Sequence, residues 1–291
     1  MSFLSQTQQR IAAITGRMTV SRGLTGLALV VLLAIIAATA HQLLNLRAAT
    51  IAETDRQLTR LNMVFAEQTG RAVETVDFVL NTAIEILQTA RRIPPSDTPA
   101  LEARLGRRAN GIRQLTAVAL TDPSGKVILS SKREATENLG EPARRALAFH
   151  AARPEAGLCI TEPLRLPDRT WAVLLTRRLT NTEGGFDGIA IAVLNLAYFQ
   201  DFFRSVDLDD KGAIVLHHRD GTVLTRYPVA DAAVGTSFAD LPPFRDVLSK
   251  AQFGSILMIS PVDGSLRLVA IACTGQDSMH CLQSPHSCAA I

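Results

Sequence analysis

The sequence predicts an α+β protein with an N-terminal transmembrane helix, a long stalk helix and two tandem antiparallel-sheet modules, the second of them incomplete. Three observations lead to this prediction. An uncharged apolar run fills residues 23–46, and an amphipathic helical pattern fills residues 47–92. The strand and turn patterns that follow occur once and then recur later in the chain.

The membrane helix is predicted because residues 23–46 contain no Asp, Glu, Lys or Arg. As a helix this run would rise about 36 Å, enough to cross a hydrocarbon core of about 30 Å. The alternative is a cleaved secretory signal, since Arg17 and Arg22 precede the run and Ala38-Thr39-Ala40 resembles a cleavage site. The run is longer than the ~7–15 apolar residues of such signals, which favours an uncleaved anchor.

The charges that flank this run predict its orientation. Positive charge precedes it at Arg10, Arg17 and Arg22, whereas acidic residues such as Glu53 follow it soon afterwards. The positive-inside rule therefore places residues 1–22 in the cytoplasm and the main domain outside. The net charge of +3 includes no Lys/Arg run, so we expect the lipid bilayer and no nucleic acid as a partner.

The stalk helix is predicted from apolar residues at steps of three and four between Leu58 and Ile86. Such a stripe suits a core helix packed on a sheet. It also suits a seam between two copies of the chain, so a homodimer through the stalk is a second, compatible interpretation.

The first module begins with an expected helix at 98–111 and a hairpin around Asp122-Pro123-Ser124-Gly125, where Pro presets φ and Gly accepts positive φ. Its other expected elements are a helix near 141–152, strands at 158–164, 170–179 and 188–195, and a helix at 196–205.

The second module repeats this pattern, with Asp220-Gly221 in the place of the first hairpin turn and expected strands at 255–261 and 265–271. A strand matching 188–195 is missing, which would leave a sheet edge bare. The tail has no clear period, so we expect that a reading-frame change or truncation removed the last strand. The predicted regions are 1–22 cytoplasmic, 23–46 transmembrane, 47–92 long helix, 93–205 first module, 206–272 incomplete second module and 273–291 irregular tail.

Cys273, Cys281 and Cys288 crowd this tail with His280 and His286. Their spacing does not match the compact pairs of zinc sites, and a disulfide is the alternative outside the cytoplasm. We expect no metal and no cofactor.

With these patterns the chain resembles the double Cache extracellular sensor of bacterial membrane signalling proteins. The segments that carry the resemblance are Leu58–Ala90, Val118–Ser130, Ile160–Leu179, Gly188–Phe203 and Gly212–Pro228. The resemblance implies a PAS-like sheet in each module, a bacterial inner-membrane location with a periplasmic domain, and a small ligand in the membrane-distal module. It also implies a second membrane helix and an output domain, neither of which follows residue 46.

Candidate ligand-binding residues follow from the resemblance, which places the pocket on the central strands and the helix that covers them. They are Phe149, His150, Trp171, Thr176, Arg177 and Asp187. Trp171 and Arg177 share one strand face, and an Arg fork beside an aromatic suits a ligand carboxylate. The alternative is that Trp171 belongs to the core and Arg177 is solvated or salt-bridged. Ala148 stands where relatives tend to carry an aromatic residue, which argues against an amino-acid ligand.

No nucleophile elbow, His-Glu-x-x-His motif or paired-carboxylate pattern occurs, so a hydrolase is not favoured. His217-His218 ends a strand, so the two side chains point to opposite faces and are interpreted as part of a surface turn. The leading hypothesis is an extracytoplasmic sensor for a small molecule without its own output domain. The alternatives are a fragment of a sensor histidine kinase or diguanylate cyclase, and a structural membrane protein that binds no ligand.

Overall fold

The computed structural model describes the backbone of residues 3–92, 97–206, 212–248, 250–260, 264–273 and 288–290. The chain divides into two compact units, Met1–Arg56 and Gln57–Ile291, which are treated separately below. Helix α1 (Phe3–Arg92) contributes to both units.

The first unit is the N-terminal part of α1. Its apolar side chains are exposed, for example Leu27 at 62%, Leu32 at 57% and Ile36 at 55%. Within the described residues, one helical stretch, Gly26–Arg91, contains a window apolar enough to cross a membrane, with a mean hydropathy of 2.3 and no buried residues. Exposed apolar residues all round a helix are typical of a segment solvated by lipid.

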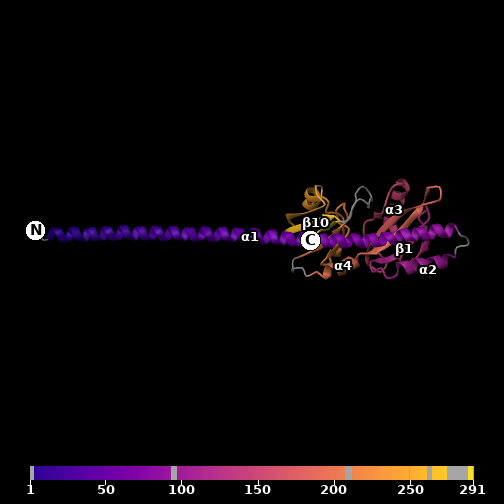
Figure 1. Cartoon of the computed structure of the whole chain (residues 1–291), viewed down its shortest axis with the longest axis horizontal. Coiled ribbons are helices and arrows are strands. Elements are labelled where there is room, and N and C mark those ends of the chain that lie inside the picture. The colour runs from indigo at the N-terminus through magenta and orange to yellow at the C-terminus, as the bar shows by residue number, and fades with distance from the viewer. Residues whose placement is uncertain are drawn as a thin grey trace. The chain divides into compact units, whose positions relative to one another are not determined.

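The second unit contains a sheet with the strand order β2-β1-β6-β5-β3, and β4 also pairs with β5. All of the strand pairs within it are antiparallel. We call this sheet and its helices the first module. Figure 1 shows α1 running beside it and α2 close to β1, whereas α3 packs on β5 and β6. Its elements are α2 (Thr98–Ala109), β1 (Leu115–Thr121), β2 (Val127–Ser130), η1 (Arg133–Ala135), α3 (Gly140–Ala152), β3 (Cys159–Ile160), β4 (Leu164–Arg165), β5 (Trp171–Thr180), β6 (Phe186–Asn195) and α4 (Ala197–Arg204).

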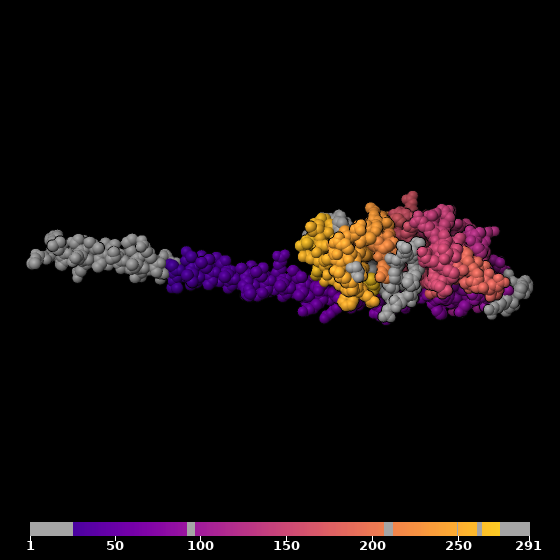
Figure 2. Space-filling view, turned by 90° about the horizontal axis from the view of Figure 1, so that it is seen from above, coloured from indigo at the N-terminus to yellow at the C-terminus, as the bar shows by residue number. Residues whose placement is uncertain are grey.

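The second module has the order β8-β7-β11-β10-β9, which repeats the order of the first sheet. Figure 2 shows this orange-to-yellow part of the chain beside the magenta and pink first module. The expected duplication of an antiparallel α+β module is therefore confirmed. Its elements are β7 (Ile214–His217), β8 (Val223–Tyr227), η2 (Asp231–Ala233), the π-helical η3 (Pro243–Leu248), β9 (Phe253–Ile259), β10 (Leu266–Cys273) and β11 (Cys288–Ala290).

The structure corrects the expectation of a bare edge in the second sheet. β11, from the predicted irregular tail, lies between β7 and β10, where β6 lies in the first sheet. It has three residues against ten in β6, so this position is filled by a much shorter strand. Residues 274–287, with Cys281, His280 and His286, lie outside the described residues, as does the side chain of Cys288.

The first sheet is buried on both faces, which explains its nearly continuous apolar strands. Val173 and Leu175 of β5 join the core cluster that contains Val76 and Leu80 of α1. Ala172 and Leu174 point the other way, into the cluster under α3. The sheet thus has an α1 face and an α3 face, and the alternation predicted for β5 is confirmed.

One predicted strand is broken. The sequence predicts a continuous strand over 158–164, but β3 ends at Ile160 and β4 begins at Leu164. Pro163 lies in the gap and has no backbone N–H to donate to a ladder, so pairing with β5 is interrupted there.

Candidate functional site

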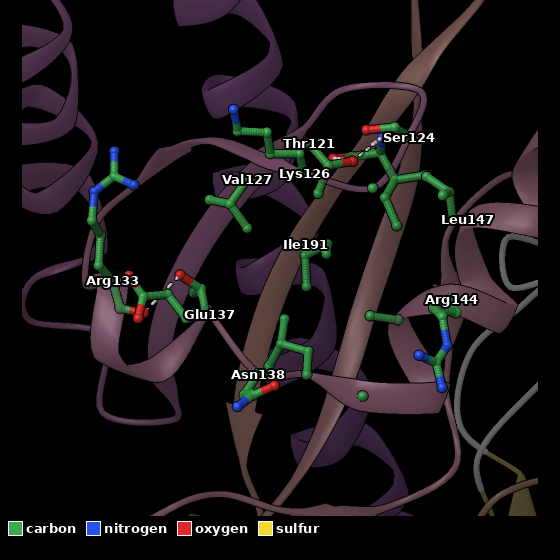
Figure 3. A pocket seen from close by; sticks show the side chains of 16 residues that line it. Thr121, Ser124, Lys126, Val127, Arg133, Glu137, Asn138, Arg144, Leu147 and Ile191 are labelled. Atoms are coloured by element: carbon green, nitrogen blue, oxygen red, sulfur yellow. Dashed lines mark hydrogen bonds between the residues drawn. The ribbon is translucent and has the colours of Figure 1, made fainter.

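A pocket of about 570 Å³ lies on the α3 face of the first sheet. The β1–β2 hairpin, the segment 133–139, the start of α3 and strand β6 surround it (Figure 3). Its volume falls in the range of small-molecule sites. The lining residues are Thr121, Ser124, Gly125, Lys126, Val127, Arg133, Thr136, Glu137, Asn138, Leu139, Gly140, Ala143, Arg144, Leu147, Ile189 and Ile191.

The wall of the pocket on the sheet side is apolar. Ile189 and Ile191 of β6 lie in the α3-face cluster with Leu139, and Ala143 and Leu147 of α3 pack against the same cluster. Strand β6 provides this wall because its alternate residues point to the α3 face. A ligand here would place an apolar part against the sheet and its polar groups toward the hairpin and the loop.

The hairpin that borders the pocket is held by Asp122. Its Oδ1 accepts hydrogen bonds from the Ser124 N–H at 2.8 Å, the Ser124 hydroxyl at 2.6 Å and the Lys126 N–H at 3.0 Å. The hydrogen bond from the Ser124 side chain is the main cause that lowers the pKa of Asp122 below its ordinary 3.8. Asp122 therefore stays ionised, and its Oδ1 accepts hydrogen bonds from its own turn. The Lys126 side chain consequently extends from a hairpin whose backbone is held in place.

Cations outnumber carboxylates among the lining residues. Arg133 donates to Glu102 at 2.6 Å, and Arg144 donates to Glu141 at 2.6 Å. Lys126 forms no salt bridge within the described residues. The lining thus carries Lys126, Arg133 and Arg144 against the single carboxylate of Glu137. Because Glu102 and Glu141 neutralise the two arginines, Lys126 is the lining cation best placed to attract an anionic group on a ligand.

A buried polar pair lies beside the apolar wall. The His150 Nε2 atom is 3.0 Å from the Thr176 hydroxyl, and both residues are fully buried. Thr176 of β5 is the cross-strand neighbour of Ile191. Burial lowers the pKa of His150 to about 4, so its ring is neutral at pH 7. Within the described residues, its Nδ1 atom has no hydrogen-bond partner.

The six predicted site residues divide between the two faces of the sheet. Phe149, His150 and Thr176 come together on the α3 face, where the Phe149 and His150 rings meet edge to face at 5.4 Å. The other three, Trp171, Arg177 and Asp187, do not join them. No one of the six belongs to the lining of the pocket.

Arg177 and Asp187 both pair with α1. Arg177 binds the Asp77 carboxylate with two hydrogen bonds of 2.5 and 2.9 Å. Asp187 pairs with Arg91. The salt-bridged alternative for Arg177 is therefore what the structure shows.

Trp171 lies at the junction of the two modules. Its indole N–H donates to Asp231 of the second module at 3.3 Å. Its carbonyl accepts from the N–H of Leu196, directly before α4, at 3.0 Å.

The interpretation of His217-His218 as a surface turn is wrong. His217 is 4% exposed and His218 8% exposed, because Phe238 and Phe244 pack on the His217 ring. Burial lowers the pKa of His217 to about 4. His218 pairs with Asp220 at 3.0 Å. Within the described residues, no group of three His, Cys, Asp or Glu side chains could hold a metal ion.

Sequence reasoning missed the residues that line the pocket. A usable signal was present, since the Asp122 turn and the start of α3 flank a polar stretch that contains Arg133, Glu137 and Asn138. Loops between rigid elements often carry binding residues.

Comparison with known proteins agrees with this architecture. Residues 196–277 match the dCache_1-like family, described as a histidine kinase sensor domain. The extracellular domain of a protein described as a histidine kinase, rpHK1S-Z16, superposes with a TM-score of 0.69 at 24% identity, covering 82% of this chain and 94% of that one. No curated protein sequence matches the chain significantly.

Two ligand complexes are also similar. The ligand-binding domain of the Pseudomonas fluorescens chemoreceptor CtaA with L-isoleucine has a TM-score of 0.58 at 18% identity and covers 84% of this chain and 93% of that one. The Pseudomonas aeruginosa amino acid chemoreceptor PctB with L-Arg has a TM-score of 0.58 at 16% identity, covering 82% and 94%. The chain thus has the fold of the double Cache extracellular sensor, and the matched domains are sensor domains rather than catalytic ones.

Proposed function

We propose that this chain is a membrane-anchored extracytoplasmic sensor that binds a small organic anion, such as a carboxylate, in the pocket on the α3 face of its first module. The observation that carries this proposal is the combination of an apolar wall at Ile189 and Ile191 with Lys126, a lining cation that forms no salt bridge within the described residues. The similar sensor domains that hold L-isoleucine and L-Arg support a small-molecule ligand.

Lys126 is the side chain best suited to hold the anionic group. It follows a hairpin fixed by Asp122, and it forms no salt bridge within the described residues, whereas Arg133 and Arg144 already bind glutamates. An ammonium–carboxylate hydrogen bond is stronger than a neutral one, so its loss should weaken binding by about tenfold or more.

The test is calorimetric titration of the purified full chain with L-isoleucine, 4-aminobutyrate, propionate and benzoate, and with glucose as an uncharged compound. Lys126→Gln should weaken binding of the best acid at least tenfold. Lys132→Gln is the matched control, because Lys132 is exposed in the loop that follows β2 and does not line the pocket. Equal affinity of Lys126→Gln and wild type would contradict the proposal, as would the absence of binding by every acid.

For the anchor, we propose that residues 23–46 span the bacterial inner membrane with the N-terminus in the cytoplasm. The exposed apolar side chains of this stretch and the basic residues before it support this orientation. Single cysteines placed at Ser5 and Ser124 in a cysteine-free chain test it. An impermeant maleimide applied to intact spheroplasts should label only the second, and labelling of the first alone would reverse the topology.

For assembly, we propose a homodimer along α1. Within the second unit, Val64 is 52% exposed and Phe78 is 70% exposed. They are fourteen positions apart in the sequence, so they lie on one helix face at heptad spacing. Phe78→Asp should shift sedimentation toward the monomer, whereas Ala103→Asp at an exposed position of α2 should not. A wild-type chain that sediments as a monomer at all concentrations would refute the dimer.

A further inference from the structure

A cluster of three side chains joins the two modules outside their shared core. Asp231 of η2 accepts from Arg165 of β4 at 2.6 Å and from the Trp171 indole N–H at 3.3 Å. The Arg165 guanidinium also lies over the Trp171 ring, 4.6 Å from its centroid. Arg165 and Trp171 are cross-strand neighbours in β4 and β5, so one carboxylate holds both strands of the hairpin.

We propose that Asp231, Arg165 and Trp171 form an inter-module latch, in which Asp231 holds the β4–β5 hairpin to the second module. The latch is released or tightened when a ligand fills the pocket of the first module. The inference rests on the proposed function in one respect, namely that a ligand binds in and leaves this pocket. The latch is otherwise argued from contacts that do not involve a ligand.

The first-module side of the latch is connected to the wall of the pocket. Leu164 and Leu166, on either side of Arg165, pack in the α3-face cluster with Ile189 and Ile191. Those two isoleucines also line the pocket. Since close-packed side chains transmit displacements, a ligand that moves α3 or the β6 wall moves the segment that carries Arg165.

The second-module side is tied to its sheet. The segment that begins at Asp231 returns to β8, because the Gly235 N–H donates to the Val223 carbonyl at 2.8 Å and the Val223 N–H donates to Thr236 at 2.9 Å. Val223 is fully buried. A displacement of Asp231 is therefore passed to β8 rather than absorbed by a loose loop.

Opening the latch should require little free energy. The side chains of Arg165 and Asp231 are 43% and 58% exposed, and exposed ion pairs contribute little to stability. Solvent can replace each contact as it breaks. A ligand therefore needs only a modest difference in affinity between the latched and unlatched states to shift their populations.

The chain carries its own reporter of the latch, because Trp171 is its only tryptophan. Indole emission shifts to longer wavelength and is quenched more readily by acrylamide when the ring becomes more solvated. Asp231→Asn removes the charge that holds Arg165 over the ring. We expect a red-shifted emission and stronger quenching in Asp231→Asn, and wild-type behaviour in Asp240→Asn, which alters an exposed aspartate elsewhere in the second module.

Pocket occupancy is imitated without a ligand by Ala143→Phe, since Ala143 lines the pocket and packs on the α3-face cluster. Ala151→Phe, at an exposed position of the same helix, is the matched control. Ala143→Leu is a smaller filling that covers the case in which the phenylalanine variant does not fold, as judged by circular dichroism. The experiment uses the full chain in detergent.

We expect Ala143→Phe or Ala143→Leu to change Trp171 emission and quenching, Ala151→Phe to leave them unchanged, and the effect to be lost in the Asp231→Asn background. The latch is overturned if Trp171 emission is the same in wild type, in the Ala143 variants and in Ala151→Phe. It is also overturned if the Ala143 substitutions change the emission to the same extent in the Asp231→Asn background. Because no ligand is used, failure of the acid titrations would count against the proposed function alone.

Discussion

Acid should weaken the first module through His150, and the size of the effect can be worked out from its surroundings. The ring is fully buried between α3 and β5, with the Thr176 hydroxyl on Nε2. The charged group nearest to it is cationic, since Arg178 of β5 donates to the His150 carbonyl, and Arg177 on the other face of β5 adds a smaller repulsion. Protonation of His150 would therefore bury a positive charge beside the Arg178 guanidinium.

The pKa of His150 is lowered from its ordinary 6.5 to about 4, mainly by burial. A folded-state pKa below the unfolded-state pKa means that stability is fully present above pH 6.5 and is lost as the pH falls toward 4. Proton linkage between these two pKa values gives a loss of about 2 kcal/mol at pH 5 and about 3 kcal/mol at pH 4, relative to pH 7.5.

The assay is urea unfolding of the full chain at pH 7.5 and pH 5, followed by the fluorescence of Trp171. His150→Gln keeps a polar group near Thr176 and does not titrate. The difference in free energy of unfolding between wild type and His150→Gln should change by about 2 kcal/mol between the two pH values, because other titrating groups cancel. His41→Gln, at an exposed position of α1, should cause no such change. Parallel pH dependence of wild type and His150→Gln would refute the reasoning.

Three further substitutions test packing and ion pairing within the second unit. Gly188→Ala should destabilise the first module by about 3 kcal/mol or more, because Gly188 has φ +110° and a Cβ would lie 2.1 Å from the Thr121 carbonyl oxygen; an unchanged melting temperature would contradict this. Arg177→Met should lower the free energy of unfolding by about 2 kcal/mol, because it leaves Asp77 unpaired. Ligand affinity in calorimetry should stay unchanged. A loss of affinity without a loss of stability would instead make Arg177 a ligand contact. Thr69→Val should stabilise the chain by about 1 kcal/mol in urea unfolding, since within the described residues its buried hydroxyl has no partner; destabilisation would reveal a missed hydrogen bond.

The duplicated fold could be predicted because local patterns determine it. The turn glycine Gly125 recurs 96 positions later as Gly221, and both glycines have positive φ. The strand β11 could not be predicted in the same way. It has three residues and no measurable alternation, and it is a strand only because β7 and β10 offer hydrogen-bonding edges on both sides.

The site could be predicted only in part, because alternation assigns residues to a common face and does not say what covers that face. Trp171 and Arg177 share a face as predicted, but α1 covers it, and the Arg177 fork meets Asp77, a hundred positions earlier in the chain. That contact is set by the tertiary packing of α1 on the sheet. No local property of β5 distinguishes a carboxylate of the protein from a carboxylate of a ligand.

The α1 face of the first sheet is covered by a helix and the α3 face carries the pocket, and this difference has a consequence for ligand specificity. Charged residues on the α1 face of the sheet must be neutralised by the helix that covers them, as Arg177 is by Asp77, and they are then unavailable to a ligand. On the α3 face the strands present Ile189 and Ile191, so the polar groups of the pocket come from the hairpin and from residues 133–139. Loops tolerate substitution better than a doubly buried sheet. Ligand preference in such a module should therefore be changed by substitutions at Lys126, Glu137 or Asn138 with little change in melting temperature, whereas substitutions at Ile189 or Ile191 should alter affinity and stability together.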